Sequence, residues 1–312
     1  MRGEMARYPD ARFSRRAFVR ISAFWSAAIL TGAGSGCAAL RKESYHQAGE
    51  ARMITIQSRD GTPIACRKSG SGPPLLLVHG TTADHTRWTS VAPAFEDKFT
   101  VFAVDRRGRG ESGDTDPYAI QREFEDVAAV IDSITGPVNV LGHSYGAICC
   151  LEAVLLAKNV RKLILYEPPI PTGIQIYPPG APERIQALVD EGDREGAVAT
   201  FFREIVRMPE KELEMLRSLP VWKSRVASAH TIAREMTFDK HYKFLPERFS
   251  GLDVPTLLLL GGDSPPFLRK AIEAVHSALP DSRIVEMPGQ QHTAMNTAPA
   301  LFAAEVLRFL LE

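Results

Sequence analysis

Short apolar runs recur along the chain from about residue 52 and alternate with stretches that carry apolar residues at helical spacing. Runs with little polar content indicate strands that are covered on both faces. A hairpin signal at Asp60-Gly61 joins the first two predicted strands. The predicted strands lie at 53–57, 64–67, 75–78, 101–104, 138–141, 163–165, 256–260 and 283–287, and clear amphipathic helices lie at 120–134, 147–157 and 298–311. The alternation predicts an α/β fold with a mostly parallel eight-stranded sheet, flanked by helices and opened by an antiparallel hairpin.

One long segment, 168–251, interrupts this alternation. It opens with six prolines between residues 168 and 182 and continues with helical patterns but no convincing strand. A helical segment inserted between two buried strands has to form a lobe outside the sheet. We therefore predict a core made of 52–167 and 252–312, with a helical cap at 168–251.

Composition narrows the class of protein. The chain has 312 residues, of which 45% are apolar and 24% charged, and its formal net charge is zero. These values are ordinary for a globular protein, and without a basic stripe nucleic acid is not an expected partner. Cys66, Cys149 and Cys150 fall in predicted elements and are expected in the core rather than in disulfides. No cluster has the spacing of a zinc site, so we expect neither a metal nor an organic cofactor.

The first forty residues have the pattern of an export signal. Arg15 and Arg16 precede an apolar run over 21–30, which is too short for the roughly 20 residues that span a bilayer. The paired arginines, with Phe18 two positions later, resemble the twin-arginine signal of bacteria. Small residues before Cys37 resemble a lipoprotein processing site, whereas ordinary cleavage nearby and an uncleaved tail are the alternatives. We expect an exported protein, periplasmic or anchored on the outer side of the inner membrane through a lipid on Cys37; the sequence does not indicate an oligomeric state.

A candidate nucleophile lies at Gly142-His143-Ser144-Tyr145-Gly146, between a predicted strand and a predicted helix. A serine on such a sharp turn is held out from the surface, and the flanking glycines avoid side-chain clashes. The helix that follows directs amide groups at developing negative charge. In this context the motif is specific, although the five-residue pattern alone is common.

From about residue 52 onward the chain resembles the α/β-hydrolase family, whose motifs it carries in the family's order. The resemblance implies that the turn His79-Gly80-Thr81-Thr82 supplies one oxyanion-hole amide, that of Thr81, and that Tyr145 supplies the other. His79 is expected to brace this turn. Asp105 resembles another family position, where pairing with a nearby arginine would brace its loop.

A serine hydroxyl needs a base, and the base needs a carboxylate to fix its tautomer. Among the downstream histidines only His292 lies in a loop between the last strand and the last helix, so it is the predicted base. The family's usual acid position falls on Asp263, directly after a buried strand, and Asp263 is the predicted acid. Glu167, which follows the preceding strand, is the rival, because some family members place the acid there.

The predicted activity is that of a serine hydrolase that cleaves a carboxylic ester of a small to medium, apolar substrate through an acyl-enzyme. Trp88, Trp222 and Phe238 are candidate substrate-lining residues, with core packing as the alternative. Related chemistries in the family, namely cleavage of C–C bonds, lactones or amides and formation of peracids, remain open. A ligand-binding protein without catalysis on the same fold is the alternative from another class.

Overall fold

The computed structural model describes residues 51–174 and 176–312. The predictions for Arg15, Arg16 and Cys37 therefore lie outside the described residues. Within these residues, none of the helices is both long enough and apolar enough to cross a membrane. Cys66, Cys149 and Cys150 are buried free thiols, as expected for core residues.

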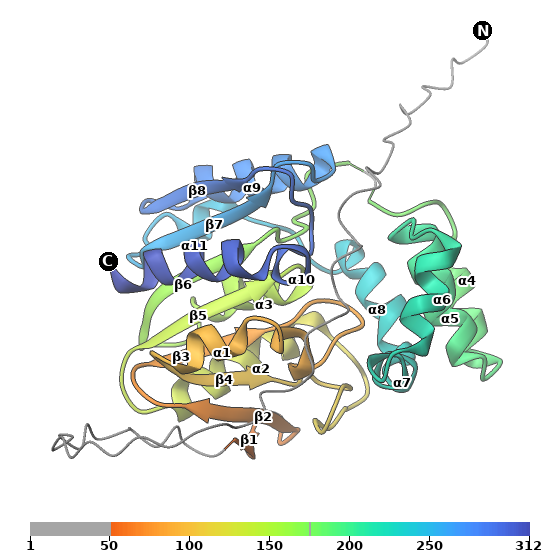
Figure 1. Ribbon diagram of the computed structural model, residues 1–312, viewed down its shortest axis with the longest axis horizontal. Helices are drawn as coiled ribbons and strands as arrows, with labels where there is room; N and C mark the ends of the chain where they lie inside the picture. Colours follow the sequence, from red (N-terminus) through yellow and green to blue (C-terminus); the bar gives the residue numbers. More distant parts are fainter. Residues whose placement is uncertain (1–50, 175) are drawn as a thin grey trace, which may run out of the picture. The chain divides into compact units, whose positions relative to one another are not determined.

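The core of the protein is one eight-stranded sheet with the order β1-β2-β4-β3-β5-β6-β7-β8 (Figure 1). β2 pairs antiparallel with both β1 and β4, and all the remaining pairs are parallel. The predicted mostly parallel sheet is thus confirmed, with the antiparallel hairpin at one edge. The strands are β1 (Arg52–Gln57), β2 (Pro63–Gly70), β3 (Pro74–Val78), β4 (Thr100–Val104), β5 (Val138–His143), β6 (Val160–Tyr166), β7 (Thr256–Gly261) and β8 (Ser282–Met287).

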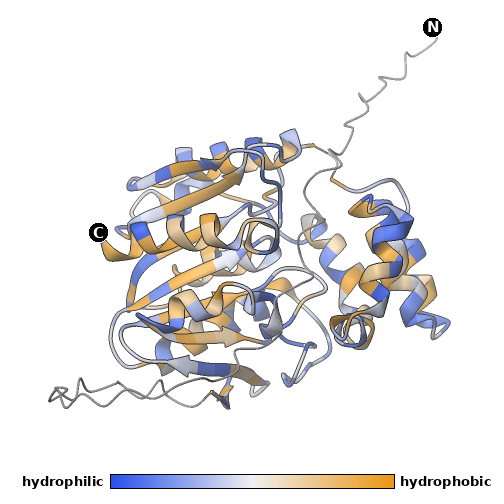
Figure 2. Ribbon diagram, in the orientation of Figure 1, coloured by the Kyte–Doolittle hydropathy of each residue, from blue (hydrophilic) through white to orange (hydrophobic). Residues whose placement is uncertain are grey.

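Both faces of the sheet are buried, because successive side chains of a strand point to opposite sides. In β3, Leu76 and Val78 join the core formed with α2 (Ile120–Ser133), α3 (Tyr145–Ala153) and α9 (Pro266–Ala278). Leu75 and Leu77 join the opposite core, against α1 (Ala92–Glu96) and α11 (Pro299–Leu311). Figure 2 shows the consequence, since the central strands are hydrophobic along most of their length while the helices carry both colours.

The insertion between β6 and β7 is helical, and within 168–174 and 176–251 it contains no strand. Its helices group together (Figure 1) and enclose a hydrophobic cluster of their own, which includes Ile185, Phe202, Leu213 and Trp222. Its elements are α4 (Ala181–Asp190), α5 (Arg194–Thr200), the π-helical η2 (Phe201–Ile205), α6 (Glu210–Ser218), α7 (Val221–Ala227), η3 (Ala229–Thr231), α8 (Ile232–Met236), η4 (Phe238–Lys240) and η5 (Pro246–Phe249). Two shorter helices lie in loops of the core, η1 (His85–Trp88) after β3 and α10 (Ala294–Thr297) before α11.

A buried ionic network joins the inserted helices to the core. Oε1 of Glu235, in α8, accepts hydrogen bonds from Arg106 and Arg109, which follow β4. Arg106 also pairs with Glu123 of α2 at 2.6 Å, and all of these side chains are nearly or completely inaccessible to solvent. Because a buried charge is costly unless it is paired, this network holds α8 against the loop after β4.

Candidate active site

Ser144 lies at the turn between β5 and α3, as its sequence motif predicts. Its backbone has φ +55° and ψ −126°, a conformation that is rare for a residue with a side chain. Its N–H donates to the carbonyl of Tyr166 at 2.8 Å, and its own carbonyl accepts from Ala147 at 2.8 Å. These bonds hold the turn in a shape that the backbone alone would disfavour, and such strain is typical of a nucleophile held at the end of a strand.

The two glycines of the motif are needed because other backbone passes close to them. A Cβ atom on Gly146 would lie 2.2 Å from the carbonyl oxygen of His79, and one on Gly142 would lie 2.6 Å from Cα of Ala147. Both distances are far below van der Waals contact. The glycines thus allow β3 and α3 to approach the serine turn.

The imidazole of His292 is hydrogen-bonded to a carboxylate, and that carboxylate belongs to Glu167. Nδ1 of His292 lies 2.5 Å from Oε2 of Glu167. The other oxygen, Oε1, accepts the N–H of Gly261 at 2.7 Å, and the glutamate side chain is fully buried. An ionised carboxylate only accepts, so Nδ1 carries the proton, and Nε2 is left as the basic nitrogen.

This geometry corrects the sequence prediction that Asp263 orients His292. Asp263 follows β7, is exposed, and is held through its backbone N–H, which donates to Gln290 at 2.9 Å. Glu167 follows β6 and has a positive φ of 48°, so the chain turns sharply there. The turn buries the longer glutamate side chain under the amide of Gly261, at the position from which it reaches His292.

The serine turn and the histidine loop are in direct contact. The ring of His143 donates from Nε2 to the carbonyl of His292 at 2.8 Å, and the centroids of the two rings lie 4.7 Å apart. Burial, and next the charge of His292, hold the pKa of His143 well below its ordinary value, which keeps this ring neutral. Ser144, Glu167 and His292 thus lie at the carboxyl ends of β5, β6 and β8, the edge at which open α/β sheets carry their sites.

The predicted oxyanion donors lie at the same edge. Tyr145 is the first residue of α3, and the first amides of a helix have no acceptor within it. Thr81 lies in the turn after β3, directly before Thr82, whose φ is +59°. This arrangement places backbone donors on the two segments that flank Ser144.

His79 is fully buried and braces the loops around this turn. Its Nδ1 donates to the carbonyl of Gly80 at 2.8 Å, while Nε2 accepts the N–H of Arg106 at 3.1 Å. Burial, and next the charge of Arg106, depress the pKa of His79 well below its ordinary value. Both ring nitrogens are therefore engaged in a neutral, structural imidazole.

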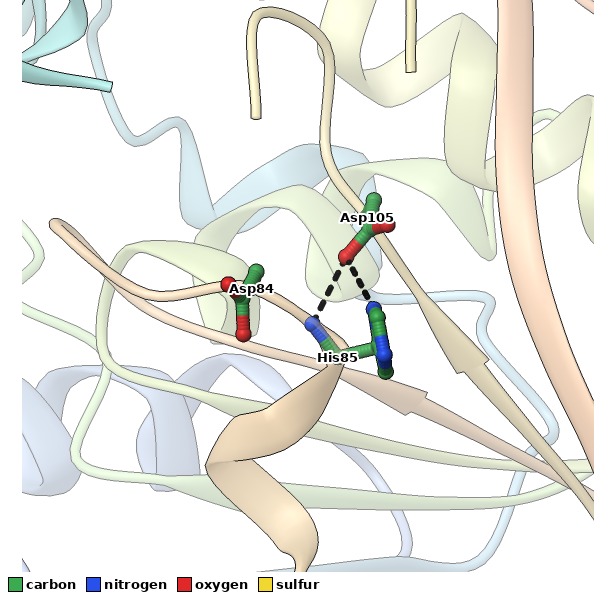
Figure 3. A group of neighbouring side chains, drawn as sticks. All are labelled: Asp84, His85 and Asp105. Atoms are coloured by element: carbon green, nitrogen blue, oxygen red, sulfur yellow. Dashed lines mark hydrogen bonds and ion pairs between the residues drawn. The ribbon is translucent and has the colours of Figure 1, made fainter. Parts of the chain in front are cut away.

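Asp105 braces its loop through different partners from those expected. Figure 3 shows its Oδ1 accepting both the backbone N–H and Nδ1 of His85, at 2.7 and 2.8 Å. Its Oδ2 accepts the N–H of Glu111, so the expected arginine partner is replaced by His85.

Potential ligand atoms of Asp84, His85 and Asp105 lie within 4.8 Å of one another. Asp84 already caps η1 through the N–H of Thr86 and Asp105 is fully engaged, so the donor set fits a structural junction better than a cation site.

The three predicted substrate-lining aromatics are all buried in hydrophobic packing. Trp88 is 1% exposed and packs edge-on against His143. Trp222 belongs to the hydrophobic cluster of the inserted helices, and Phe238 packs between Tyr145 and Tyr242. These positions favour the packing alternative for each of them.

This architecture, with its nucleophile turn and histidine–carboxylate pair, is that of an α/β hydrolase. A model of the "Alpha/beta hydrolase family" matches residues 75–305. The chain therefore belongs to the alpha/beta hydrolase family.

Solved structures and curated proteins supply further comparisons. The crystal structure of an alpha/beta hydrolase from Sphaerobacter thermophilus DSM 20745 is 36% identical, with a TM-score of 0.72 over 82% of this chain and 100% of that chain. The esterase RhEst1 from Rhodococcus sp. ECU1013 has a TM-score of 0.65 at 22% identity, over 83% of this chain and 98% of that chain, and shares the fold. The "Probable oxidoreductase EphD" of Mycobacterium tuberculosis (strain ATCC 25618 / H37Rv) is 34% identical over 100 residues, which are 30% of this chain and 17% of that protein. The chain thus matches about a sixth of the length of this curated relative.

Sequence reasoning did not single out two arginines near this edge, Arg87 in η1 and Arg225 in α7. Nη1 of Arg225 donates to the carbonyl and the hydroxyl of Thr82 at 2.8 and 2.7 Å. Arg87 acts electrostatically on His143 and Tyr166, the neighbours in sequence of Ser144 and Glu167. Nothing in the local sequence distinguishes these arginines from surface residues, because their significance depends on what surrounds them.

Proposed function

We propose that this protein is a serine hydrolase that cleaves carboxylic esters through an acyl-enzyme, with Ser144 as nucleophile, His292 as base and Glu167 as the acid. The observation that carries the proposal is the hydrogen bond between Nδ1 of His292 and the buried carboxylate of Glu167, next to the strained turn at Ser144. Such a pair leaves Nε2 of the imidazole basic and oriented. Structural neighbours described as esterases agree with this activity.

In the first step Nε2 of His292 takes the proton of Ser144 while the serine oxygen attacks the carbonyl carbon. The amides of Thr81 and Tyr145 stabilise the resulting oxyanion, each contributing roughly 3 kcal/mol to lowering the barrier. The bond to the alcohol then breaks, and His292 gives its proton to the departing oxygen. Water, activated by the same imidazole, hydrolyses the acyl-enzyme to release the acid and restore the serine.

Labelling with a fluorophosphonate probe tests this proposal. The wild-type protein should form a covalent adduct that Ser144→Ala abolishes. Ser250→Ala is the matched control, since Ser250 is an exposed serine whose hydroxyl bonds only to the local carbonyl of Glu247. A wild-type protein that remains unlabelled at full folding, verified by its melting temperature, favours the non-catalytic ligand-binding alternative.

A panel of esters, lactones, amides and β-diketones then distinguishes the bond type. We expect the esters to turn over fastest and with burst kinetics, because an acyl-enzyme accumulates when its hydrolysis is slow. A protein that cleaves only a lactone, an amide or a C–C bond, or that forms peracids from an acid and peroxide, would move the activity to another branch of the family.

We also propose that the protein is exported, as the arginine pair at Arg15 and Arg16 favours. Changing both to lysine should retain the protein in the cytoplasm of a bacterial host. Cys37→Ser tests the lipid anchor separately, since it should release an exported protein from the membrane fraction. Unchanged fractionation in the double lysine variant contradicts export by this route.

A further inference from the structure

Buried arginines in this protein are, as a rule, paired with carboxylates. Arg106 binds Glu123 and Glu235, Arg107 binds Asp126 at 2.7 Å, and Arg109 binds Glu235. Removing a guanidinium from water is costly unless an anion replaces the water. These three arginines therefore follow the rule that a buried guanidinium is paired with a carboxylate.

Arg87 departs from this rule. Arg87 is half-buried, and among the described residues its guanidinium has no ion pair and no hydrogen bond, while its Nε is fully enclosed without a partner. Burial, and next the like charge of Arg225, lower the pKa of Arg87 to about 10, so it remains protonated at neutral pH. A charged group is thus partly withdrawn from water, and the described residues supply it with no ion pair.

Arg225, in α7, is the second such cation, and its charge acts on that of Arg87. It is 9% exposed, stacks over Phe202 at 5.1 Å, and uses one nitrogen to hold the carbonyl and hydroxyl of Thr82. Its Nε is enclosed without a partner, and the described residues offer it no carboxylate within ion-pair distance. Asp84 acts on Arg225 from beyond that distance, and its carboxylate binds the N–H of Thr86.

Both arginines adjoin the segments that carry the proposed chemistry. Arg225 is anchored on Thr82, next to the amide of Thr81. Arg87 directly precedes Trp88, whose ring packs edge-on against His143, and the charge of Arg87 acts on His143 and Tyr166. Two like charges close together disfavour each other, and a bound anion removes both the repulsion and the lack of hydrogen-bond acceptors. Arginine is the side chain best suited to hold a carboxylate, because its planar donors match both oxygens.

We infer that Arg87 and Arg225 bind a carboxylate group of the substrate, so that this hydrolase acts on esters that carry a free acid. The inference rests on the proposed function, and it replaces the expectation of a wholly apolar substrate with one that has an anionic end. Arg87 provides the main contact, since the described residues use neither of its two terminal nitrogens. Arg225 adds positive charge while it holds Thr82, in the turn that carries the amide of Thr81.

Two matched pairs of reagents test this inference for the two halves of an ester. For the acyl half, the inactivation rate is measured with p-nitrophenyl ethyl butylphosphonate and with its analogue that ends in a carboxylate. For the alcohol half, kcat/KM is measured with 4-carbamoylbenzyl and 4-carboxybenzyl valerate. In at least one pair the wild-type protein should prefer the anionic reagent by about 10- to 100-fold, as expected for one or two charge-assisted hydrogen bonds.

The same measurements on Arg87→Gln should reduce that preference at least tenfold. Arg184→Gln is the control, because Arg184 lies on α4 and pairs at the surface with Glu204, and it should keep the wild-type preference. Arg225→Gln should slow both members of each pair, since it also releases Thr82. The melting temperature of each variant verifies folding.

The outcomes separate the two claims. If neither phosphonate inactivates the wild-type protein, the serine-hydrolase proposal fails. If both phosphonates react and neither pair shows a preference for the anion, or if Arg87→Gln keeps the preference, the carboxylate site is wrong while the serine hydrolase stands.

Discussion

Glu167 and His292 are separated by 125 positions in the chain, yet Oε2 of the glutamate lies 2.5 Å from Nδ1 of the imidazole. The carboxylate is fully buried, and its second oxygen is held by the amide of Gly261. This bond fixes the tautomer and orientation of the His292 ring and leaves Nε2 able to accept a proton. The contact follows from the sheet order, in which β6 and β8 flank β7.

The exchange Glu167→Gln should lower kcat/KM on a reactive ester by on the order of 10⁴-fold, because an amide no longer fixes the productive tautomer of His292. The amide oxygen can still accept from Gly261, so the fold should be retained. Asp263→Asn is the matched control, since this exposed residue is held through its backbone, and its activity should stay within about twofold of wild type. A large loss in Asp263→Asn with a small loss in Glu167→Gln would restore Asp263 as the acid.

The exchange Gly80→Ala should impair catalysis, because the added Cβ would lie 2.8 Å from Cβ of Ser144. Ser144 or the turn at Gly80 and Thr81 then has to shift, and a displacement of about 1 Å can reduce the rate by about 10²-fold. The measurement is kcat/KM on the same ester, with Gly251→Ala as the control, since a Cβ on Gly251 meets no atom within 4 Å. Equal activity of the two variants would show that the loop adapts without effect on the chemistry.

Replacing Glu235 by glutamine should destabilise the protein by about 3 kcal/mol, measured by urea unfolding. The change leaves Arg106 and Arg109 without the buried charge that joins them to α8, and breaking such a pair is far more costly than losing a surface pair. Glu204→Gln, which removes a solvent-exposed pair with Arg184, should change stability by about 1 kcal/mol or less. A loss below about 1 kcal/mol in Glu235→Gln would mean that the inserted helices are held mainly by other contacts.

Stability should fall as the pH drops below about 6.5, the ordinary pKa of histidine. The pKa values of His79 and His143 are depressed in the folded protein, chiefly by burial, so below that pH the unfolded chain binds more protons than the folded one. Each of the two contributes a loss of up to about 1.4 kcal/mol per pH unit. His85 acts in the opposite sense, because its hydrogen bond to Asp105 raises its pKa; its stabilising contribution is complete below pH 6.5 and is lost as the pH rises through its raised pKa.

Urea unfolding at pH 7.5, 6.5 and 5.5 measures this dependence. His143→Gln places an amide nitrogen near the position of Nε2, so it keeps a donor for the carbonyl of His292, and it should reduce the slope below pH 6.5 by about 1 kcal/mol per pH unit. His276→Asn, at an exposed position on α9, should leave the slope unchanged. A wild-type protein that is equally stable at pH 5.5 and 7.5 would contradict neutral burial of these two rings.

The positions of the strands and of Ser144, the proposed nucleophile, could be predicted from local pattern. Apolar runs such as that at β7 mark segments buried on both faces. The Gly-x-Ser-x-Gly motif between a strand and a helix indicates a sharp turn at which only glycine avoids a clash. His292 could be found because it follows the last strand in a loop, and parallel strands end at one edge. These features are local, so the sequence carries them directly.

The tertiary structure decided which carboxylate binds His292 and which arginines find no carboxylate among the described residues. Glu167 and Asp263 both follow buried strands, and only the path of the backbone, with a positive φ at Glu167, determines which side chain reaches the imidazole. Arg87 and Arg225 differ from the paired arginines only in the groups that long-range folding places around them. Hydrophobic periodicity determines which face of an element is buried, whereas contacts between polar side chains depend on distances of a few ångströms between segments far apart in sequence.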